Sequence, residues 1–240
     1  MSSEPNGGKI RLFCFPYAGG GTVAFRLWQK YLPQAIRVCP VQLPGRGPRI
    51  GEPAFTDLNL LVQSAASALG PYFDQSFAFF GHSMGALIAF ELARLLQFRK
   101  GPAPLHLFLA GQAAPHLPRN EAPMHQLPQP ELVNALRHMS GTPPEILDNA
   151  EALALFVPML RADFSLVERY HYSPGPPLTC PVYALGGLED PNITREDLSG
   201  WARHTTRFAL TMLPGNHFFI LKSIPSVMTI IVRTLAHYLC

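Results

Sequence analysis

The sequence predicts an α/β domain with a mostly parallel central sheet, helices on both faces and a helical lid insertion. Apolar runs typical of buried strands alternate with stretches of helical period, which favours parallel strands joined by right-handed crossovers. Glycines and prolines collect between these segments, where turns are expected. The alternation stops after Gly111 and resumes near residue 181. We therefore expect a core formed by residues 1–111 and 171–240, with residues 112–170 inserted as the lid.

Length and composition limit the possible classes of protein. A chain of 240 residues with 48% hydrophobic residues can fold as one large domain with a full core. The net charge of +3 comes from 19 Lys and Arg against 16 Asp and Glu, which is too mild and too scattered to indicate nucleic-acid binding. No apolar run approaches the roughly 18 residues that a membrane-spanning helix needs, so we expect no membrane insertion.

The N-terminal residues and the cysteines indicate a cytoplasmic protein. Residues 1–9 are polar and lack the apolar segment of a secretory signal. The cysteines, at positions 14, 39, 180 and 240, lie far apart without the pairing that metal sites show. We expect reduced and mostly buried thiols, with neither disulfides nor a metal site.

Strands and helices alternate along the first half of the chain. Strands are predicted at residues 10–15, 37–43, 76–80 and 105–110. Helices are predicted at residues 23–32, 56–72 and 86–96, and Thr56 or Asp57 is the expected N-cap of the second. A glycine-rich loop at residues 16–21 directly follows the first strand, which is a good place for backbone N–H groups to face a ligand. It is not a P-loop, because no Gly-Lys-Ser/Thr follows it.

The second half begins with the segment that interrupts the sheet. Residues 112–130 contain five prolines and no strand pattern, and helices are predicted at residues 130–139, 143–147 and 151–170. Helices inserted over the carboxyl edge of a sheet can cover a nucleophile and exclude water, or they can be a decoration without a gating role. The sheet resumes with strands at residues 181–185 and 207–213, and helices are predicted at residues 195–204 and 224–239.

The segment at residues 76–96 predicts a serine nucleophile. Gly81-His82-Ser83-Met84-Gly85 lies between an apolar strand and a helix, which is the context that a G-x-S-x-G nucleophile elbow requires. Such a turn would raise Ser83 Oγ above the carboxyl edge of the sheet on a strained backbone. The alternative is a turn of small residues that only permits tight packing.

A serine at its free pKa is a poor nucleophile, so it needs a histidine base and a carboxylate that orients the histidine. In this arrangement the chain order is serine, acid, histidine. His217 lies in a loop directly after a predicted strand, although a histidine that caps the final helix would look the same. Asp190 closes the loop after the strand at residues 181–185, and Glu189 is the weaker candidate for the acid.

An oxyanion hole should combine two backbone N–H groups beside Ser83. The N–H of Met84, the residue after the nucleophile, is the first donor. The second should come from the loop after the first strand, from Tyr17 or Ala18, and Ala18 is favoured. We expect His82 to turn into the protein as a hydrogen-bonded structural residue rather than to take part in the chemistry.

Several stretches together resemble the type II thioesterases, the stand-alone editing hydrolases of polyketide and nonribosomal peptide assembly. The matching stretches are Phe15-Pro16-Tyr17-Ala18-Gly19-Gly20, Leu43-Pro44-Gly45-Arg46, Gly81-His82-Ser83-Met84-Gly85, Leu160-Arg161-Ala162-Asp163-Phe164, and the loops that contain Asp190 and His217. They cover nearly the whole chain, and the Leu-Arg-Ala-Asp run is the most specific of them. The resemblance implies an α/β-hydrolase fold.

The resemblance also implies a substrate and a partner. The substrate would be an acyl thioester on the phosphopantetheine arm of an acyl or peptidyl carrier protein, hydrolysed through a Ser-His-Asp triad without a cofactor of the enzyme's own. A local basic patch would face the acidic carrier, with Arg46, Arg49 and Arg161 as candidates. Arg46 fits an ordinary solvated turn arginine equally well, and Arg161 with Asp163 can instead tie the lid helix to the body. We expect a monomer.

Three other functions fit parts of the same pattern. A small-molecule carboxylesterase or lipase would use the same scaffold and the same nucleophile. A product-releasing or cyclising thioesterase would share the family. A non-catalytic interaction protein would keep the fold without the reaction.

Overall fold

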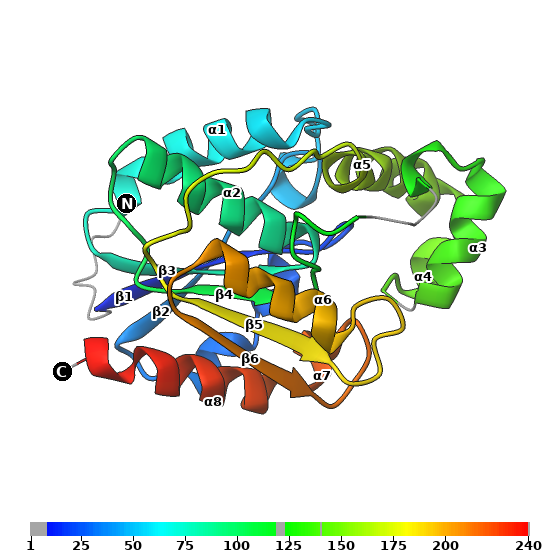
Figure 1. Cartoon of the computed structure of the whole chain (residues 1–240). Helices are drawn as coiled ribbons and strands as arrows, with labels where there is room; N and C mark the ends of the chain where they lie inside the picture. The colour runs from blue at the N-terminus through cyan, green and yellow to red at the C-terminus, as the bar shows by residue number, and fades with distance from the viewer. Residues whose placement is uncertain (1–8, 119–122, 140, 240) are drawn as a thin grey trace.

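A six-stranded parallel sheet forms the centre of the molecule (Figure 1). The computed structural model describes residues 9–118, 123–139 and 141–239. The strands lie in the order β2-β1-β3-β4-β5-β6, and neighbouring strands are parallel throughout. Their bounds are β1 Ile10–Phe15, β2 Ile36–Pro40, β3 Ser76–His82, β4 Leu107–Ala110, β5 Val182–Gly187 and β6 Phe208–Leu213. The predicted parallel sheet is confirmed.

Helices cover both faces of this sheet, as predicted. One face carries α1 (Leu58–Leu69), α2 (Met84–Phe98) and α6 (Arg195–Ser199), and the other carries α8 (Ile224–Leu235) (Figure 1). Each face has its own apolar core, because successive side chains of a strand point to opposite faces. In β3, for example, Phe79 belongs to the core under α1 and α2, and Phe80 belongs to the core over α8.

The strand register brings the predicted site residues to one edge of the sheet. At the carboxyl ends, His82 of β3 pairs with Ala110 of β4, and Gly187 of β5 pairs with Leu213 of β6. Ser83 therefore follows β3 directly, and the loops with Asp190 and His217 follow β5 and β6 at the same edge. Parallel topology places these three segments together although they are far apart in the chain.

Several predicted helices are shorter or differently wound than expected. Residues 23–32 form two 3₁₀ helices, η1 (Thr22–Phe25) and η2 (Trp28–Tyr31), instead of one α-helix. The predicted helix at 56–72 is α1 followed by η4 (Gly70–Tyr72), and that at 195–204 is α6 followed by η6 (Gly200–His204). The predicted helix at 224–239 is α8 followed by η7 (Ala236–Tyr238), and a short helix, α7 (Phe219–Lys222), precedes it.

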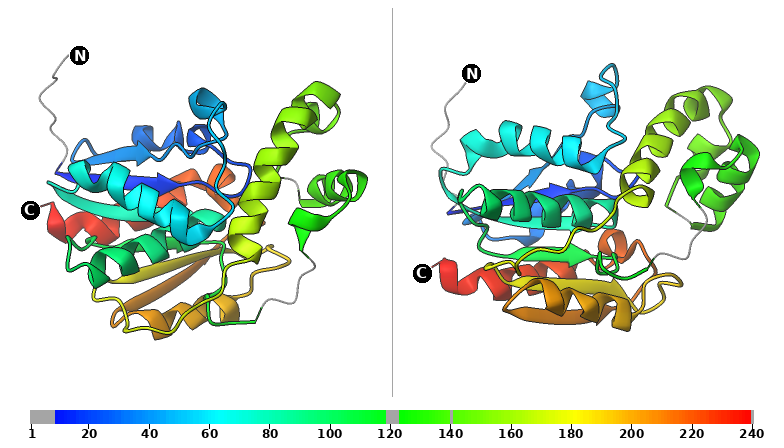
Figure 2. Two further views of the ribbon diagram at one scale, coloured as in Figure 1. Left: turned by 90° about the horizontal axis from the view of Figure 1, so that it is seen from above. Right: turned by 45° about the horizontal axis from the view of Figure 1, so that its top comes forward.

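The segment predicted as a lid contains no strand of the sheet among its described residues. It contains η5 (Met124–Gln126), α3 (Gln129–Met139), α4 (Pro144–Leu147) and α5 (Ala150–Glu168), which stand beside the sheet (Figure 2). These helices share a small apolar core that includes Leu132, Leu147 and Leu160. Helix α5 reaches the body of the molecule, where it contacts α2. The division of the chain at residues 112 and 170 stays a prediction.

Three cysteines lie among the described residues, and all three are free thiols. Cys14 and Cys180 are buried and Cys39 is partly buried, while Cys240 lies outside the described residues. Burial raises the pKa of the Cys14 thiol well above its ordinary value and that of Cys180 to about 12. Within the described part of the chain, no helix is long and apolar enough to cross a membrane.

Candidate active site

Ser83 sits on a strained turn between β3 and α2. Its backbone angles, φ 53° and ψ −117°, lie where a residue with a Cβ is rarely found. The Ser83 N–H donates to the carbonyl of Ala110 at 2.7 Å, and the Ser83 carbonyl accepts from the N–H of Ala86 at 2.8 Å. The neighbouring strand β4 and the helix α2 therefore hold the turn from both sides, as a nucleophile elbow requires.

Two glycines make this turn possible by allowing backbones to approach each other closely. A Cβ on Gly81 would overlap the carbonyl group of Gly85. A Cβ on Gly85 would overlap the carbonyl group of Phe15, at the end of β1. The first turn of α2 consequently lies against the loop that follows β1.

Asp190 and His217 form a hydrogen-bonded pair. Asp190 Oδ2 lies 2.7 Å from His217 Nδ1, and the Asp190 side chain is fully buried. The other carboxylate oxygen accepts from the N–H groups of Asn192 at 3.0 Å and Ile193 at 3.3 Å. The acid is therefore fixed in one orientation, while the adjacent Glu189 is exposed.

The ring of His217 lies beside the elbow. Its centroid is 5.1 Å from that of His82, the residue before Ser83. A Cβ on Gly111, which follows β4, would lie 2.7 Å from the His82 ring and 3.4 Å from the His217 ring. No hydrogen bond joins Ser83 to His217 among the described residues. The structure thus brings His217 into contact with Asp190 and places its ring at the elbow.

The two expected oxyanion donors lie at the start of α2 and in the loop after β1. Met84 is the first residue of α2, and Ala18 lies in the turn after β1. Gly19 and Gly20, which follow Ala18, use their N–H groups in hydrogen bonds to Asp163 and to the Tyr17 carbonyl. In the described part of the chain, the N–H groups of Ala18 and Met84 have no acceptor. Both are therefore available to a bound oxygen.

His82 is buried as expected, but it is not hydrogen-bonded as expected. Its side chain is fully inaccessible, and neither ring nitrogen makes a hydrogen bond of good geometry with the described residues. Burial, reinforced by the nearby His217, lowers the pKa of His82 well below its ordinary value, although backbone groups of His217 and Ala110 oppose the shift. His82 is therefore a neutral ring packed edge-on against Tyr17 and Phe219.

Arg46 is buried, so both expectations for it are wrong: it is neither a solvated turn arginine nor a free cation for an anionic partner. Its guanidinium makes a bidentate ion pair with Asp163 of α5, with distances of 2.5 Å and 2.8 Å, and the two side chains are 7% and 1% exposed. Arg46 also donates to the Gly20 carbonyl at 2.9 Å, and Asp163 accepts from the Gly19 N–H at 2.8 Å. The pair therefore holds the loop of Ala18 to helix α5.

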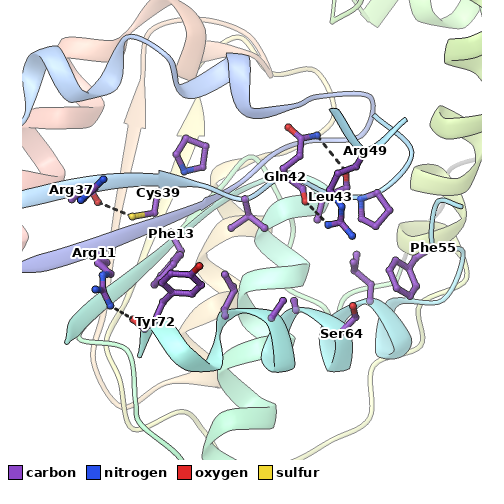
Figure 3. A pocket seen from close by; sticks show the side chains of 17 residues that line it. Arg11, Phe13, Arg37, Cys39, Gln42, Leu43, Arg49, Phe55, Ser64 and Tyr72 are labelled. Carbon is purple, nitrogen blue, oxygen red and sulfur yellow. Dashed lines mark hydrogen bonds between the residues drawn. The ribbon is translucent and has the colours of Figure 1, made fainter. Parts of the chain in front are cut away.

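Arg161 and Arg49 are also engaged within the protein. Arg161 donates to the carbonyls of His125 and Leu127 at 2.7 Å and 2.6 Å, which ties η5 to α5. It does not pair with Asp163. Arg49 pairs with Glu52 and donates to the Gln42 carbonyl at the edge of a cavity of about 470 Å³ between α1 and the β1–β2 side of the sheet (Figure 3). The basic patch expected from Arg46, Arg49 and Arg161 is therefore not formed by free cations.

No group of three or more His, Cys, Asp or Glu side chains in the described ranges is placed to hold a metal ion. The cavity beside Arg49 is lined by none of Ser83, Asp190 and His217. The arrangement at the carboxyl edge instead offers a hydroxyl, an imidazole, a buried carboxylate and two backbone donors. This is the chemistry of acyl transfer through a serine.

Comparison with known families identifies the family of this chain. The thioesterase domain family matches residues 10–237. The chain belongs to the thioesterase family. It is a thioester hydrolase of the serine-hydrolase type, and the expected resemblance to type II thioesterases is confirmed.

Two bacterial proteins are among those similar to this chain. The thioesterase is 46% identical to "Linear gramicidin dehydrogenase LgrE" of Brevibacillus parabrevis, over 96% of this chain and 89% of that protein. It is 44% identical to "Gramicidin S biosynthesis protein GrsT" of Aneurinibacillus migulanus, over 90% and 84%. The name of LgrE refers to a dehydrogenase, whereas the matching family and the similar solved structures carry the thioesterase description.

Solved thioesterases share the fold. RedJ, a thioesterase from the prodiginine biosynthetic pathway of Streptomyces coelicolor, superimposes with a TM-score of 0.90 at 40% identity, and the match covers 97% of this thioesterase and 92% of RedJ. The predicted α/β-hydrolase fold is thereby confirmed.

Proposed function

We propose that this thioesterase hydrolyses acyl thioesters from the phosphopantetheine arm of carrier proteins in polyketide or nonribosomal peptide assembly, and so removes aberrant acyl units. The observation that carries the proposal is the buried Asp190–His217 pair at the same sheet edge as the strained Ser83. The names of GrsT and RedJ, which refer to gramicidin S and prodiginine biosynthesis, support the assignment to such an assembly.

In the proposed first step, His217 acts as the base. Its Nδ1–H donates to Asp190, which leaves Nε2 with a free lone pair for the proton of Ser83 Oγ. Ser83 attacks the thioester carbonyl, the carbon–sulfur bond breaks, and the proton held by His217 passes to the departing pantetheine sulfur. The product is an acyl-serine and a free pantetheine thiol.

In the second step, water replaces the thiol. His217 takes a proton from the water, which attacks the acyl-serine, and the same proton returns to Ser83 Oγ as the carboxylic acid leaves. In both steps the negative oxygen is held by the N–H groups of Ala18 and Met84. Removal of one such donor from a serine hydrolase typically costs about 10²–10³ in kcat. The enzyme supplies these groups from its own chain, and the phosphopantetheine belongs to the substrate.

Helix α5 supplies the apolar cover of the proposed site. Gly19 lies close to Phe156 and Leu160 of α5, because a Cβ at that position would be 3.0 Å from each side chain. A dry environment on this side strengthens the hydrogen bonds to the oxyanion and protects the acyl-serine until water is admitted.

Ser83→Ala tests the mechanism directly. The variant should fold as the wild type does and should lose hydrolysis of an acyl-loaded carrier protein by several powers of ten. A fluorophosphonate probe should label the wild type and fail to label the variant. Retention of most activity by Ser83→Ala would remove Ser83 from the mechanism, and absence of labelling of the wild type would favour a non-catalytic protein.

Two further assays separate the related functions. A carboxylesterase or lipase would hydrolyse a p-nitrophenyl ester better than an acyl carrier thioester, which is the reverse of the order expected here. A cyclising thioesterase would release a macrocycle from a long acyl chain, whereas this enzyme should release the linear acid.

A further inference from the structure

Acidic and basic residues are segregated along this chain. Residues 5–51 contain seven Lys or Arg and no Asp or Glu, and residues 198–240 contain four Lys or Arg and no Asp or Glu. All 16 acidic residues therefore lie in the rest of the sequence. The mild net charge of +3 conceals this separation.

Four helices of the two acid-free stretches lie together on one side of the sheet, whereas residues 200–204 of the second stretch lie with α6 on the opposite side. Helices η1 and η2 come from the first stretch, α7 and α8 come from the second, and η2 contacts α8. The opposite side of the sheet is covered by α1, α2 and α6, whose sequences or N-caps contain acidic residues. One layer of the molecule is consequently basic.

Four exposed cations of this layer make no ion pair with a described residue. They are Arg26, Lys30, Lys222 and, in the last turn of α8, Arg233. Elsewhere on the molecule, Arg11 pairs with Asp74 and Arg137 pairs with Asp148, whereas Arg99 and Arg195 are exposed and make no ion pair with a described residue. The basic layer differs from the rest of the surface because its helices η1, η2, α7 and α8 contain no acidic residue.

Exposed apolar side chains lie among these cations. Val23 is 66% exposed, Leu27 is 38% exposed and Leu221 is 39% exposed. Together with Ile224 they line a cavity of about 360 Å³, which Arg26 also lines. We call Val23, Arg26, Leu27, Lys30, Leu221 and Lys222 the docking surface. Apolar and basic side chains gathered around one cavity mark an interaction site rather than an ordinary solvated face.

The cavity on this surface leads toward the proposed active site. Its lining includes Tyr17 and Ala18 of the loop after β1, and Phe156 of the lid helix α5. The Tyr17 ring packs 5.6 Å from His82 and 5.1 Å from Phe218, measured between ring centroids. These two residues precede Ser83 and follow His217. A single aromatic ring therefore separates the cavity from the elbow.

We infer that the docking surface binds an acidic carrier protein and that its cavity admits the acylated pantetheine arm past Tyr17. This inference rests on the proposed function and assigns the partner's binding side. Unpaired Lys and Arg side chains attract an acidic partner and raise its association rate, and the apolar side chains between them give the complex its buried contact area. The docking surface has only a few cations around an apolar cavity. This combination fits a folded acidic protein that inserts an extended arm better than it fits a nucleic acid or a flat membrane.

Charge reversal tests the inference. The double variant Lys30→Glu and Lys222→Glu changes two cations that do not line the cavity. The measurement is kcat/KM for an acetyl-loaded acyl carrier protein divided by kcat/KM for free acetyl-pantetheine. We expect this ratio to fall by about tenfold or more, because reversing two charges at the rim turns attraction of an acidic partner into repulsion. The control is Arg99→Glu, an exposed cation at the end of α2 on the other layer, which should keep the wild-type ratio.

Salt provides a second readout that requires no variant. Hydrolysis of the loaded carrier by the wild type should slow as ionic strength rises, and hydrolysis of acetyl-pantetheine should change little. A ratio that stays within about twofold of the wild-type value in the double variant, or a carrier reaction insensitive to salt, would overturn the inference while leaving the proposed function intact. A wild type that cleaves acetyl-pantetheine but not the loaded carrier would overturn both. Binding to phosphatidylglycerol vesicles that the double variant loses, with an unchanged carrier ratio, would assign the surface to membranes instead.

Discussion

The substitution Asp163→Asn should destabilise the protein strongly, because it leaves a buried guanidinium without its counter-charge. Asp163 and Arg46 are 1% and 7% exposed, so solvent cannot compensate for the lost carboxylate. Burial raises the pKa of Asp163, and the Arg46 guanidinium and the Gly19 N–H oppose that rise. Breaking a buried pair by removing one partner typically costs about 3–5 kcal/mol.

That cost can be converted into a change of melting temperature. For domains of about 150–250 residues, 1 kcal/mol corresponds to about 2–4 °C, so Asp163→Asn should lower Tm by about 6–20 °C. The matched control is Asp148→Asn, which removes the acid from the exposed lid pair of Arg137 and Asp148, whose side chains are 46% and 60% exposed. An exposed pair contributes about 0–1 kcal/mol, so the control should change Tm by no more than about 4 °C.

Urea unfolding followed by circular dichroism gives the free energies of unfolding for a double-mutant cycle. The double variant Arg46→Met and Asp163→Leu removes both buried charges, and it should be more stable than Arg46→Met alone or Asp163→Leu alone. The double variant should still hydrolyse substrate slowly. Its Gly19 N–H has lost the Asp163 carboxylate and its Gly20 carbonyl has lost the Arg46 guanidinium, so the loop of Ala18 is no longer held in place. The reasoning about the buried charge would be wrong if Asp163→Asn destabilised the protein no more than Asp148→Asn does.

Three other predictions address the proposed triad, the elbow and the histidines. Asp190→Asn should lower kcat by about 10⁴-fold, because an amide can neither hold His217 in the required tautomer nor stabilise its positive charge. A variant whose kcat stays close to that of the wild type across the pH–rate profile would contradict this role. Gly81→Ala should prevent soluble expression or lower Tm drastically, since its Cβ would overlap backbone atoms, whereas Gly51→Ala, with no atom within 4 Å of the new Cβ, should behave as the wild type. Burial lowers the pKa of His106 from 6.5 to about 4. Between these pH values the folded form therefore binds fewer protons than the unfolded form, so the free energy of unfolding should fall as the pH drops from 6.5 toward 4. His106 alone accounts for up to about 3 kcal/mol of that loss, and His106→Phe should flatten the pH dependence; an unchanged slope would show that the ring is not held neutral.

Local patterns in the sequence were sufficient to predict the sheet edge and the residues at it. Ser83, Asp190 and His217 each follow an apolar strand directly, and parallel strands bring their carboxyl ends to one edge whatever lies between them in sequence. The glycines of the elbow likewise reflect contacts made within a few residues or with the neighbouring strand. These features follow from periodicity and turn chemistry, which a single sequence displays.

Contacts across the tertiary structure were not predictable in the same way. The sequence around Arg46 resembles a solvated turn, because its partner Asp163 is 117 residues away on another helix. Periodicity does not determine how that helix packs. The missing hydrogen bonds of His82 also depend on the exact approach of the loops after β4 and β6. The absence of acidic residues from two stretches is visible in the sequence, but only the fold shows that η1, η2, α7 and α8 of these stretches form one layer.

The attachment of α5 to the glycine loop also restricts how the cover over the site can move. Asp163 and Arg161 hold the carboxyl half of this helix to the body and to η5, while Pro158 lacks the N–H that would bond one turn back in the middle of the helix. We therefore expect the hinge at Pro158, with α3, α4 and the first turns of α5 swinging as one flap. Movement of α3, α4 and the first turns of α5 would then make room for bulkier acyl chains. The loop of Ala18 would keep its shape during this movement.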